Sequence, residues 1–484
     1  MLFNSLAFAV FLPCVFFLYW ALPEKYRGAL LLIASYYFYM SWNVKYVVLI
    51  LFTTIVSYVC ALCMEKYAAR KKLLLWGALV SCLGILFLFK YFNFFMDTLA
   101  RIARVVALPV HKVTLALMLP VGISFYTFQT LSYVIDVYRG DVRAERNFFT
   151  YAAFISFFPQ LVAGPIERTG NLLPQIKEKH VFDSQKAVYG LKLMAWGFLK
   201  KLVIADNLAV YVDQIFGDVH YYSGFSMLLA ALFFTIQIYC DFSGYSDIAI
   251  GTAKLFGINL MRNFNSPYFA TSVRDFWSRW HISLSTWFRD YVYIPLGGNR
   301  KGRVRTILNQ LVTMLVSGLW HGAAFTYVVW GGIHGILQAL ENVLPFCRRH
   351  NRLSREGKER CGERVLSRVL TFTVVMLAWV FFRADSLRDA CYVLVHMWDG
   401  ISRPVLYLAQ GFADLELQTV DACLTVLLPL TLLWLYDYKA LTCDPIDAIS
   451  RLRPAVRWGI YYAFIFLVLM LASFNAQEFV YFQF

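Results

Sequence analysis

The sequence predicts an all-α protein that crosses a membrane many times, and three observations support this fold class. Of its 484 residues 60% are hydrophobic, the mean hydropathy is +0.57 and only 15% are charged, whereas soluble domains carry about 25% charged residues. The apolar residues gather in long runs, and a helix of about 20 such residues spans a bilayer. We therefore expect roughly ten to twelve spans. The clearest apolar runs are 6–22, 46–64, 73–89, 225–240 and 460–474.

The N-terminal part is expected to form four spans, ending at about residue 89. The run 6–22 lacks the basic start and the small-residue cleavage site of a removed signal peptide, so we expect it to remain as a span. Segment 91–112 has the pattern of an amphipathic loop, and 113–134 is apolar enough for a further span.

The next two segments are not simple spans. Segment 149–162 is apolar but short and broken by Pro159. Non-helical backbone at membrane depth is tolerated only where protein or a water cavity satisfies it, so we predict a re-entrant segment beside a cavity. Segment 186–208 spreads lysines among apolar residues, which fits either an amphipathic helix in the interface or a span with snorkelling lysines. These lysines are Lys192, Lys200 and Lys201.

The second half of the chain combines clear spans with polar interruptions. The span 225–240 runs into a polar insert, 241–247, which we expect at a helix end. Its two carboxylates, Asp241 and Asp247, are six positions apart, and a cap or an ion pair with a nearby arginine is favoured over acid/base catalysis. A long polar and aromatic stretch, 259–305, follows. Two broken helices around residues 320–322, a basic loop at 347–368 and roughly three more spans complete the chain. No internal repeat is visible.

The net charge of +15 is concentrated in short loops. Segments 65–72, 299–305 and 348–368 are rich in lysine and arginine, and such loops face the cytoplasm under the positive-inside rule. This topology places the N-terminus outside. No base-stacking pattern accompanies the positive charge, so we do not expect nucleic-acid binding. The motifs GxxxxGK[ST], GxSxG and HExxH are absent, which leaves ATP hydrolysis, α/β-hydrolase chemistry and zinc-protease chemistry unsupported.

Two histidines are the main candidates for chemistry. His321 stands in Trp320-His321-Gly322 between two apolar runs, and ionisable groups at membrane depth usually have a function or a partner. Because Gly318 and Gly322 flank it, we expect His321 at a helix interruption lining a cavity. His281 is either a second active-site residue or part of an interfacial aromatic belt.

Two further features have plainer interpretations. Gly297-Gly298 before basic residues can approach a phosphate, but a turn into a cytoplasmic loop is favoured. His334 is expected to hydrogen-bond to a neighbouring helix.

Several motifs, taken together, resemble the membrane-bound O-acyltransferase (MBOAT) family, and specifically its alginate O-acetyltransferase branch. The matching segments are 120–129, 157–166, 241–247, 263–268, 276–296 and 320–322. The resemblance implies one integral-membrane domain over residues 1–484, with N-terminal helices (1–112), a catalytic core (113–342) and C-terminal helices (343–484). It also implies a ring of tilted helices, with re-entrant and interfacial helices, around a thin central cavity.

The family resemblance assigns His321 as the catalytic histidine and His281 as a second recurrent histidine. A hydroxyl needs a base to take its proton as it attacks a thioester. His321 is expected to serve as this base and to return the proton to the leaving thiolate. Trp320 or backbone groups near Gly322 are candidate donors to the carbonyl oxygen. Further supporting or substrate-binding residues are expected to be Trp280, Ser283, Asp290 and Tyr293.

The leading hypothesis is an enzyme of the bacterial inner membrane that moves an acetyl group from a cytoplasmic thioester, such as acetyl-CoA, across the membrane. The acceptor is an exported or surface polysaccharide, or an SGNH-type acetyltransferase partner on the outer side. No bound cofactor or metal is expected. Two alternatives remain: D-alanyl transfer to teichoic acid from a carrier-protein thioester, and a channel or lipid transporter.

Overall fold

The computed structural model describes residues 1–484 except 108–112, 163, 346, 348–359, 474–478 and 481–484. All regular elements in these described ranges are helical, as expected. The chain divides into two compact units. Unit 1 comprises residues 1–194 and 248–261, and unit 2 comprises residues 195–247 and 262–484. The single domain expected for residues 1–484, with boundaries at 112 and 342, stays a prediction.

Five helical segments in the described part of the chain are long and apolar enough to cross a membrane: Val44–Lys66, Ala68–Val105, Phe225–Leu255, Cys361–Arg383 and Pro454–Leu471. They support a multi-pass membrane protein, while the expected total of ten to twelve spans stays a prediction. Helix α23 (Pro454–Leu471) has the surface expected of a lipid-facing helix, because its large apolar side chains are exposed. Trp458, Phe466 and Leu469 are all more than half exposed. Such an apolar surface is stable only against lipid or another apolar partner.

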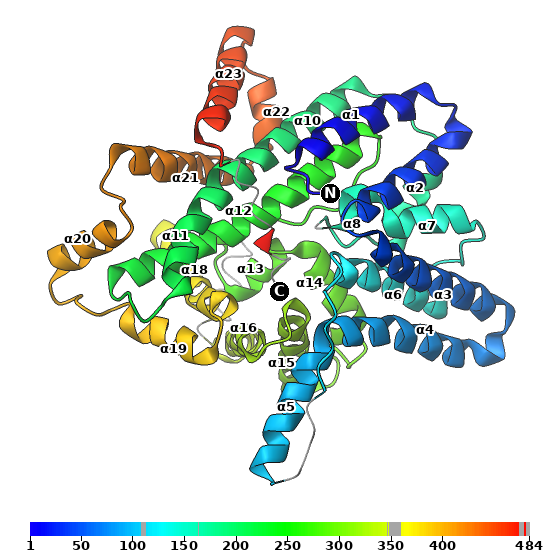
Figure 1. Cartoon of the computed structure of the whole chain (residues 1–484), viewed down its shortest axis with the longest axis horizontal. Helices are drawn as coiled ribbons and strands as arrows, with labels where there is room; N and C mark the ends of the chain where they lie inside the picture. The colour runs from blue at the N-terminus through cyan, green and yellow to red at the C-terminus, as the bar shows by residue number, and fades with distance from the viewer. Residues whose placement is uncertain (108–112, 163, 346, 348–359, 474–478, 481–484) are drawn as a thin grey trace. The chain divides into compact units, whose positions relative to one another are not determined.

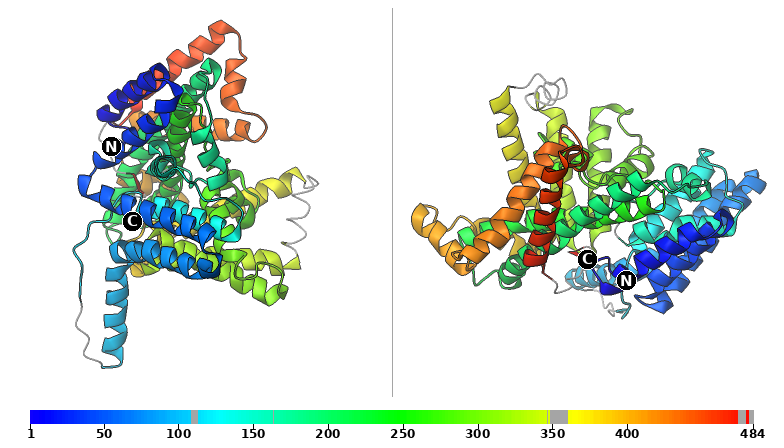
Figure 2. Two further views of the ribbon diagram at one scale, coloured as in Figure 1. Left: turned by 90° about the vertical axis from the view of Figure 1, so that its right-hand side faces the viewer. Right: turned by 90° about the horizontal axis from the view of Figure 1, so that it is seen from above.

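Unit 1 contains the N-terminal helices (Figure 1). In chain order they are α1 (Leu6–Ala21), α2 (Glu24–Met40), α3 (Val47–Lys66), α4 (Lys71–Leu86), α5 (Phe92–Val105), α6 (Ile123–Arg139), α7 (Phe148–Ser156), α8 (Phe158–Leu161), α9 (Thr169–Lys177) and the start of α10 (Ser184–Phe198). Helix α5 extends away from the rest of the unit (Figure 2).

Two expectations for unit 1 are wrong. The segment 91–112 contains helix α5 and is not a loop, although its end at 108–112 lies outside the described residues. The span expected at 113–134 does not form as such, because the helix α6 starts only at Ile123. Pro120 has no N–H to donate, and Gly122 adopts a left-handed conformation with φ +75°, so the preceding chain cannot continue this helix backwards.

The broken apolar segment at 149–162 forms two short helices, α7 and α8, separated at Phe157. Side chains satisfy the interrupted backbone. The amides of Gln129 and Gln160 both donate to the Phe154 carbonyl, at 2.8 and 2.9 Å. The Phe158 N–H donates to Ser35 Oγ at 3.0 Å. Non-helical backbone in an apolar surrounding needs hydrogen-bond partners from the protein itself. These contacts supply such partners and are compatible with a re-entrant segment, which stays a prediction.

Unit 2 contains the remaining helices. They are the end of α10, α11 (Asp206–Gly217), most of α12 (Phe225–Leu255), α13 (Val273–Arg279), α14 (Ile282–Phe288), α15 (Gly302–His321), α16 (Phe325–Val343), α18 (Cys361–Arg383), α19 (Leu387–His396), α20 (Pro404–Asp414), α21 (Val420–Ala440), α22 (Pro445–Ser450) and α23. The loop expected at 347–368 is helical from Cys361 onward, and residues 348–359 lie outside the described part.

The polar insert 241–247 is not at a helix end, because α12, which is 31 residues long, continues through it to Leu255. Its carboxylates are neutralised by lysines and not by an arginine. Lys200 Nζ lies 2.7 Å from Asp247, and Lys201 Nζ lies 2.8 Å from Asp241. Both lysines are buried in the π-helical segment η4 (Leu199–Ala205). They therefore do not snorkel, and the segment 186–208 is not a simple amphipathic surface helix.

Candidate active site

The site is built on a hairpin of two closely packed helices, α15 and α16. Glycines permit the close approach. A Cβ atom at Gly318 would overlap the Tyr327 carbonyl oxygen, and one at Gly331 would overlap the Met314 carbonyl oxygen. The hairpin turns at Gly322, where a Cβ atom would overlap the Tyr327 ring. Helix α15 thus ends at His321, as the sequence predicts for a helix interruption.

His321 is 3% exposed and is surrounded by aromatic side chains. Its ring centroid lies 5.0 Å from that of Trp320, 5.1 Å from that of Trp330 and 5.4 Å from that of Phe382. Trp330 also stacks on Trp379 at 5.2 Å. This aromatic shell keeps bulk water away from the histidine.

His281 lies at the break between the short helices α13 and α14, in a left-handed conformation with φ +43° and ψ +54°. The conformation is uncommon for a residue with a Cβ atom. It directs a fully buried ring toward the α15 terminus, with centroids 6.1 Å from Trp320 and 6.5 Å from His321. Phe242 packs edge-on against His281 at 4.6 Å. The structure therefore brings the two histidines together, and His281 is not part of an interfacial aromatic belt.

Burial lowers the pKa of His281 well below its usual range, because desolvation disfavours the charged ring. The imidazole is therefore neutral at physiological pH. Asn263 supplies the polar contact of this ring, with 3.1 Å between its Oδ1 and His281 Nδ1. Sequence analysis identified Asn263 only within the motif 263–268 and did not place it in the site, because the side chain lies 18 positions from its partner.

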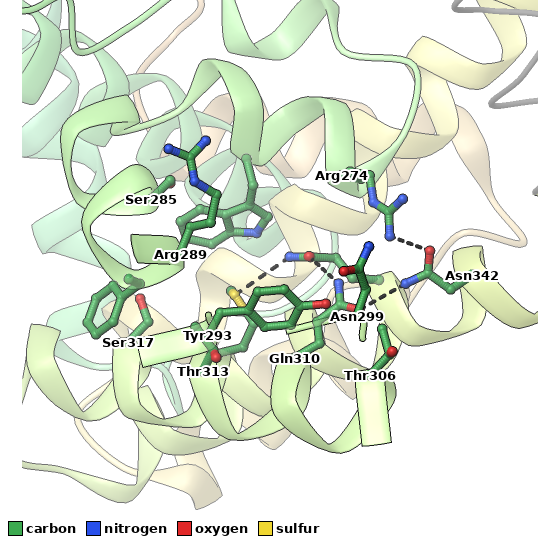
Figure 3. Close-up of a pocket in the computed structure, with 14 residues that line it drawn as sticks. Arg274, Ser285, Arg289, Tyr293, Asn299, Thr306, Gln310, Thr313, Ser317 and Asn342 are labelled. Carbon is green, nitrogen blue, oxygen red and sulfur yellow. Dashed lines mark hydrogen bonds between the residues drawn. The ribbon is translucent and has the colours of Figure 1, made fainter. Parts of the chain in front are cut away.

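A cavity of about 470 Å³ lies within unit 2 (Figure 3). Ser317, one helical turn before His321, contributes to its wall, whereas neither histidine lines it. Two arginines, Arg274 and Arg289, line the cavity, and Arg289 is paired with Asp290. The lining residues are Arg274, Trp277, Ser285, Phe288, Arg289, Tyr293, Asn299, Thr306, Gln310, Thr313, Met314, Ser317, Gln338 and Asn342.

One wall of the cavity carries a continuous chain of hydrogen bonds (Figure 3). The Arg274 guanidinium donates to Asn342 Oδ1. Asn342 Nδ2 donates to Gln310 Oε1 at 2.9 Å, Gln310 Nε2 donates to Gln338 Oε1 at 2.5 Å, and Gln338 Nε2 donates to Met314 Sδ at 3.6 Å. Polar side chains therefore extend from an arginine toward the part of α15 that precedes His321.

Helix α13 is fixed to α16 at the same place. The carboxylate of Glu341 accepts hydrogen bonds from the backbone N–H groups of Val273 and Arg274, at 2.6 and 3.1 Å. A carboxylate stabilises a helix N-terminus, where N–H groups lack intrahelical partners. This cap holds Arg274 against the hairpin and defines that side of the cavity.

Comparison with known proteins decides the family. The family model of the membrane-bound O-acyltransferases matches residues 142–382, which include both histidines. A protein of Pseudomonas aeruginosa named "Probable alginate O-acetylase AlgI" is 43% identical over 400 residues, covering 81% of this chain and 73% of that protein. The chain belongs to the membrane-bound O-acyltransferase family.

Other relatives differ in their named acceptors. The peptidoglycan O-acetyltransferase of Helicobacter pylori is 36% identical over 431 residues, covering 82% of this chain and 80% of that protein. The teichoic acid D-alanyltransferase of Bacillus subtilis is 28% identical over 287 residues, 54% of this chain and 68% of that protein. The family resemblance inferred from the motifs is confirmed, and this chain is an O-acyltransferase.

Four of the residues expected to support catalysis or bind substrate in this O-acyltransferase lie near the two histidines. Trp320 packs against both histidines, and Gly322 forms the hairpin turn. Ser283 hydrogen-bonds to Asn263. Trp280 is buried and stacks on Phe276.

Of the two remaining expected residues, Tyr293 and Asp290, only the first lines the cavity. Asp290 pairs with Arg289 at 2.7 Å and is 29% exposed, so it does not lie in the buried histidine cluster. Its contact with Arg289 nevertheless orients a residue of the cavity wall.

His334 differs from its expected role. It packs against Trp277 and Trp330, with centroids 5.3 and 5.0 Å apart. Neither of its ring nitrogens has a hydrogen-bond partner among the residues that the structure describes. The expected interhelical hydrogen bond is therefore absent there, and the ring contributes to the aromatic wall. Gly297 and Gly298, with φ +113° and +56°, form the expected turn.

Proposed function

We propose that this protein transfers an acetyl group from a cytoplasmic thioester across the bacterial inner membrane, for O-acetylation of an exported or surface polysaccharide. The observation that carries the proposal is the buried pair of His321 and His281, enclosed by aromatic side chains. A polar cavity lined by two arginines lies in the same unit, and its wall includes Ser317, one helical turn before His321. The names of the alginate and peptidoglycan relatives support an acetyl group and a polysaccharide acceptor.

The proposed reaction uses His321 as the base. Neutral His321 takes the proton of the acceptor hydroxyl as its oxygen attacks the thioester carbonyl. The tetrahedral intermediate then collapses, the carbon–sulfur bond breaks, and the proton passes to the thiolate. The indole N–H of Trp320 or backbone groups near Gly322 are candidate donors to the developing oxyanion. The aromatic shell limits competing hydrolysis.

The cavity supports a donor with a phosphopantetheine arm, such as acetyl-CoA. Arg274 and Arg289 match phosphate groups in charge, and the amide side chains of the hydrogen-bonded wall match the amides of the arm. Asn299, which begins the basic segment 299–305, and Thr306, which follows it, also line the cavity. Under the positive-inside rule this segment is cytoplasmic, which supports entry of the donor from that side.

The acceptor on the outer side is either the polysaccharide itself or an SGNH-type acetyltransferase that completes the transfer. The proposal requires no resident cofactor or metal. D-alanyl transfer to teichoic acid has weaker support, because the D-alanyltransferase of Bacillus subtilis matches a smaller share of this chain at lower identity.

The test measures ester-linked acetate on the cell's polysaccharide in the wild type, in a deletion strain, and in the deletion strain restored at matched expression with His321→Ala. We expect acetate to disappear in the deletion strain and His321→Ala not to restore it. His220→Ala is the matched control, because His220 is 51% exposed and pairs with Asp389 on the surface of unit 2; it is expected to restore acetate. Full restoration by His321→Ala would refute the mechanism. Unchanged acetate in the deletion strain would refute the acceptor or acyl group, and D-alanine esters would be assayed next.

A further inference from the structure

Asn263 is a fully buried hydrogen-bond centre beside His281. Its Oδ1 lies 3.1 Å from His281 Nδ1 and accepts from Ser283 Oγ at 2.8 Å and from the Ser283 N–H at 3.3 Å. Its Nδ2 donates to Ser246 Oγ at 3.2 Å, and its backbone carbonyl accepts from the Ile282 N–H at 2.9 Å. One residue therefore contacts the ring of His281 and the backbone of the two residues after it.

These contacts determine the orientation of the Asn263 amide. Oxygen and nitrogen of an amide side chain are distinguished by their partners. A backbone N–H can only donate, so the atom that faces the Ser283 N–H must be the oxygen. The nitrogen then faces Ser246 Oγ, which can accept.

The same argument determines the tautomer of His281. The Asn263 oxygen has no proton to give, so a hydrogen bond with His281 requires the proton on Nδ1. Because the neutral ring carries one proton, Nε2 holds the lone pair. Asn263 thus selects the one tautomer in which Nε2 can accept a proton or a hydrogen bond.

Asn263 also stabilises the backbone at His281. The φ of +43° is disfavoured for a histidine, and strained residues persist only where their surroundings hold them. The bonds from Ile282 and Ser283 to Asn263 fix the chain directly after this residue. Ring orientation and backbone conformation therefore depend on the same residue, through its side chain at His281 and Ser283 and through its backbone carbonyl at Ile282.

We propose that Asn263 is a positioning residue, which holds His281 in the Nδ1-protonated tautomer so that Nε2 can accept a hydrogen bond from the substrate, while His321 remains the base that takes the proton of the acceptor hydroxyl. This inference rests on the proposed acyl-transfer function for the role of Nε2, whereas the tautomer itself follows from geometry. Because the partner is an amide and not a carboxylate, the ring remains neutral between turnovers.

The first measurement is independent of activity. Full-length protein labelled with ¹⁵N-histidine, in lipid nanodiscs at pH 7.5, is studied by ¹⁵N NMR, and the His281 signal is assigned by its loss in His281→Gln. We expect a protonated Nδ1 and an unprotonated Nε2, with this preference lost in Asn263→Ala. A proton on Nε2 in the wild type would overturn the proposal.

The second measurement is the pH dependence of acetyl transfer from acetyl-CoA in membrane vesicles. We expect Asn263→Ala to lower the rate about 10- to 100-fold. Asn263→Asp keeps the acceptor oxygen and should recover part of this loss. Its carboxylate also raises the pKa of His281, so the neutral ring is lost at a higher pH and the acidic limb of the rate profile moves upward by about one pH unit or more. Asn207→Ala, which removes bonds to the Val203 and Leu471 carbonyls, is the control for a general packing defect.

The outcomes separate the two proposals. An unshifted acidic limb in Asn263→Asp, or equal rates for Asn263→Ala and Asn207→Ala, would overturn the positioning role. If wild-type vesicles transfer no acetyl group while the NMR spectrum shows a protonated Nδ1, the proposed donor and function fail and the assigned tautomer stands.

Discussion

The close contact between α15 and α16 predicts opposite effects for the same substitution at two glycines. In Gly318→Ala the new methyl group meets the Tyr327 carbonyl oxygen and approaches Gly331 Cα to 3.2 Å. A backbone oxygen cannot rotate away, so the helices must separate. In Gly332→Ala the nearest atom to the methyl group is Leu315 Cδ2, at 3.4 Å, which is an ordinary contact.

The size of the difference follows from two effects. Overpacking a core costs about 1–3 kcal/mol, whereas alanine in place of glycine stabilises a helix by about 1 kcal/mol. The helix gain applies to both variants, so their difference in the free energy of unfolding is the overpacking cost alone, about 1–3 kcal/mol. Gly332→Ala should raise the free energy of unfolding slightly, and Gly318→Ala should lower it by up to about 2 kcal/mol. His321 is three residues after Gly318, and a displacement of about 1 Å at a reacting group costs roughly 100-fold in rate.

The assay is thermal unfolding of both purified variants in the same nanodiscs, together with ester-linked acetate in cells at matched expression. We expect Gly318→Ala to unfold at a lower temperature than the wild type and to leave little acetate, while Gly332→Ala resembles the wild type in both measurements. Equal unfolding temperatures for the two variants would refute the argument that the hairpin's packing depends on Gly318.

Three further predictions concern the cavity, a buried carboxyl group and the buried ion pairs. Arg274→Ala removes a cation from the cavity wall, so it should raise the KM for acetyl-CoA about tenfold with a smaller change in kcat. The measurement is the initial rate of transfer in vesicles. An unchanged KM would exclude Arg274 from donor binding. Burial raises the pKa of Glu167 to about 7 from 4.5, so its contribution to stability is present below pH 4.5 and is lost as the pH rises through 7. Glu167→Gln should remove this loss of up to about 3 kcal/mol, and parallel unfolding temperatures of variant and wild type from pH 5 to 8 would contradict it. Lys201→Met leaves Asp206 and Asp241 buried without their shared cation and should destabilise the protein by about 3–5 kcal/mol. Adding Asp206→Asn and Asp241→Asn to this variant should restore much of the unfolding temperature. If the triple variant shows no such recovery, the uncompensated charge is not the cause of the destabilisation.

The sequence predicted those parts of the fold and site that depend on local pattern. Apolar runs indicated the helices, and the glycines around Trp320-His321 indicated a helix interruption, because both signals act within a few residues. The family resemblance then assigned both histidines to the site, whereas the residues around His281 also allowed an interfacial aromatic belt. The structure places the two ring centroids 6.5 Å apart, although the residues are 40 positions apart in the chain.

The predictions were wrong or incomplete where residues far apart in the sequence determine the local structure. The segment 241–247 has the composition of a helix end, yet α12 continues because Lys200 and Lys201 neutralise its carboxylates. Within the segment 186–208, lysines spread among apolar residues are typical of a surface helix, because the sequence gives no sign of their buried partners. Asn263 was not selected either, since an asparagine among aromatic residues gives no local sign that a histidine 18 positions later depends on it.

The π-helical segment η4 has a consequence for insertions and deletions in this chain. A wide turn of this kind commonly corresponds to a single extra residue in an α-helix. Residues five apart share one face of such a turn, as Lys201 and Asp206 do at 2.7 Å. Deletion of Leu202 would let an α-helix close through the segment, and the same two residues, then four apart, would still share a face. A one-residue deletion should therefore be better tolerated here than in a regular buried helix, where it would rotate all following residues by about 100°.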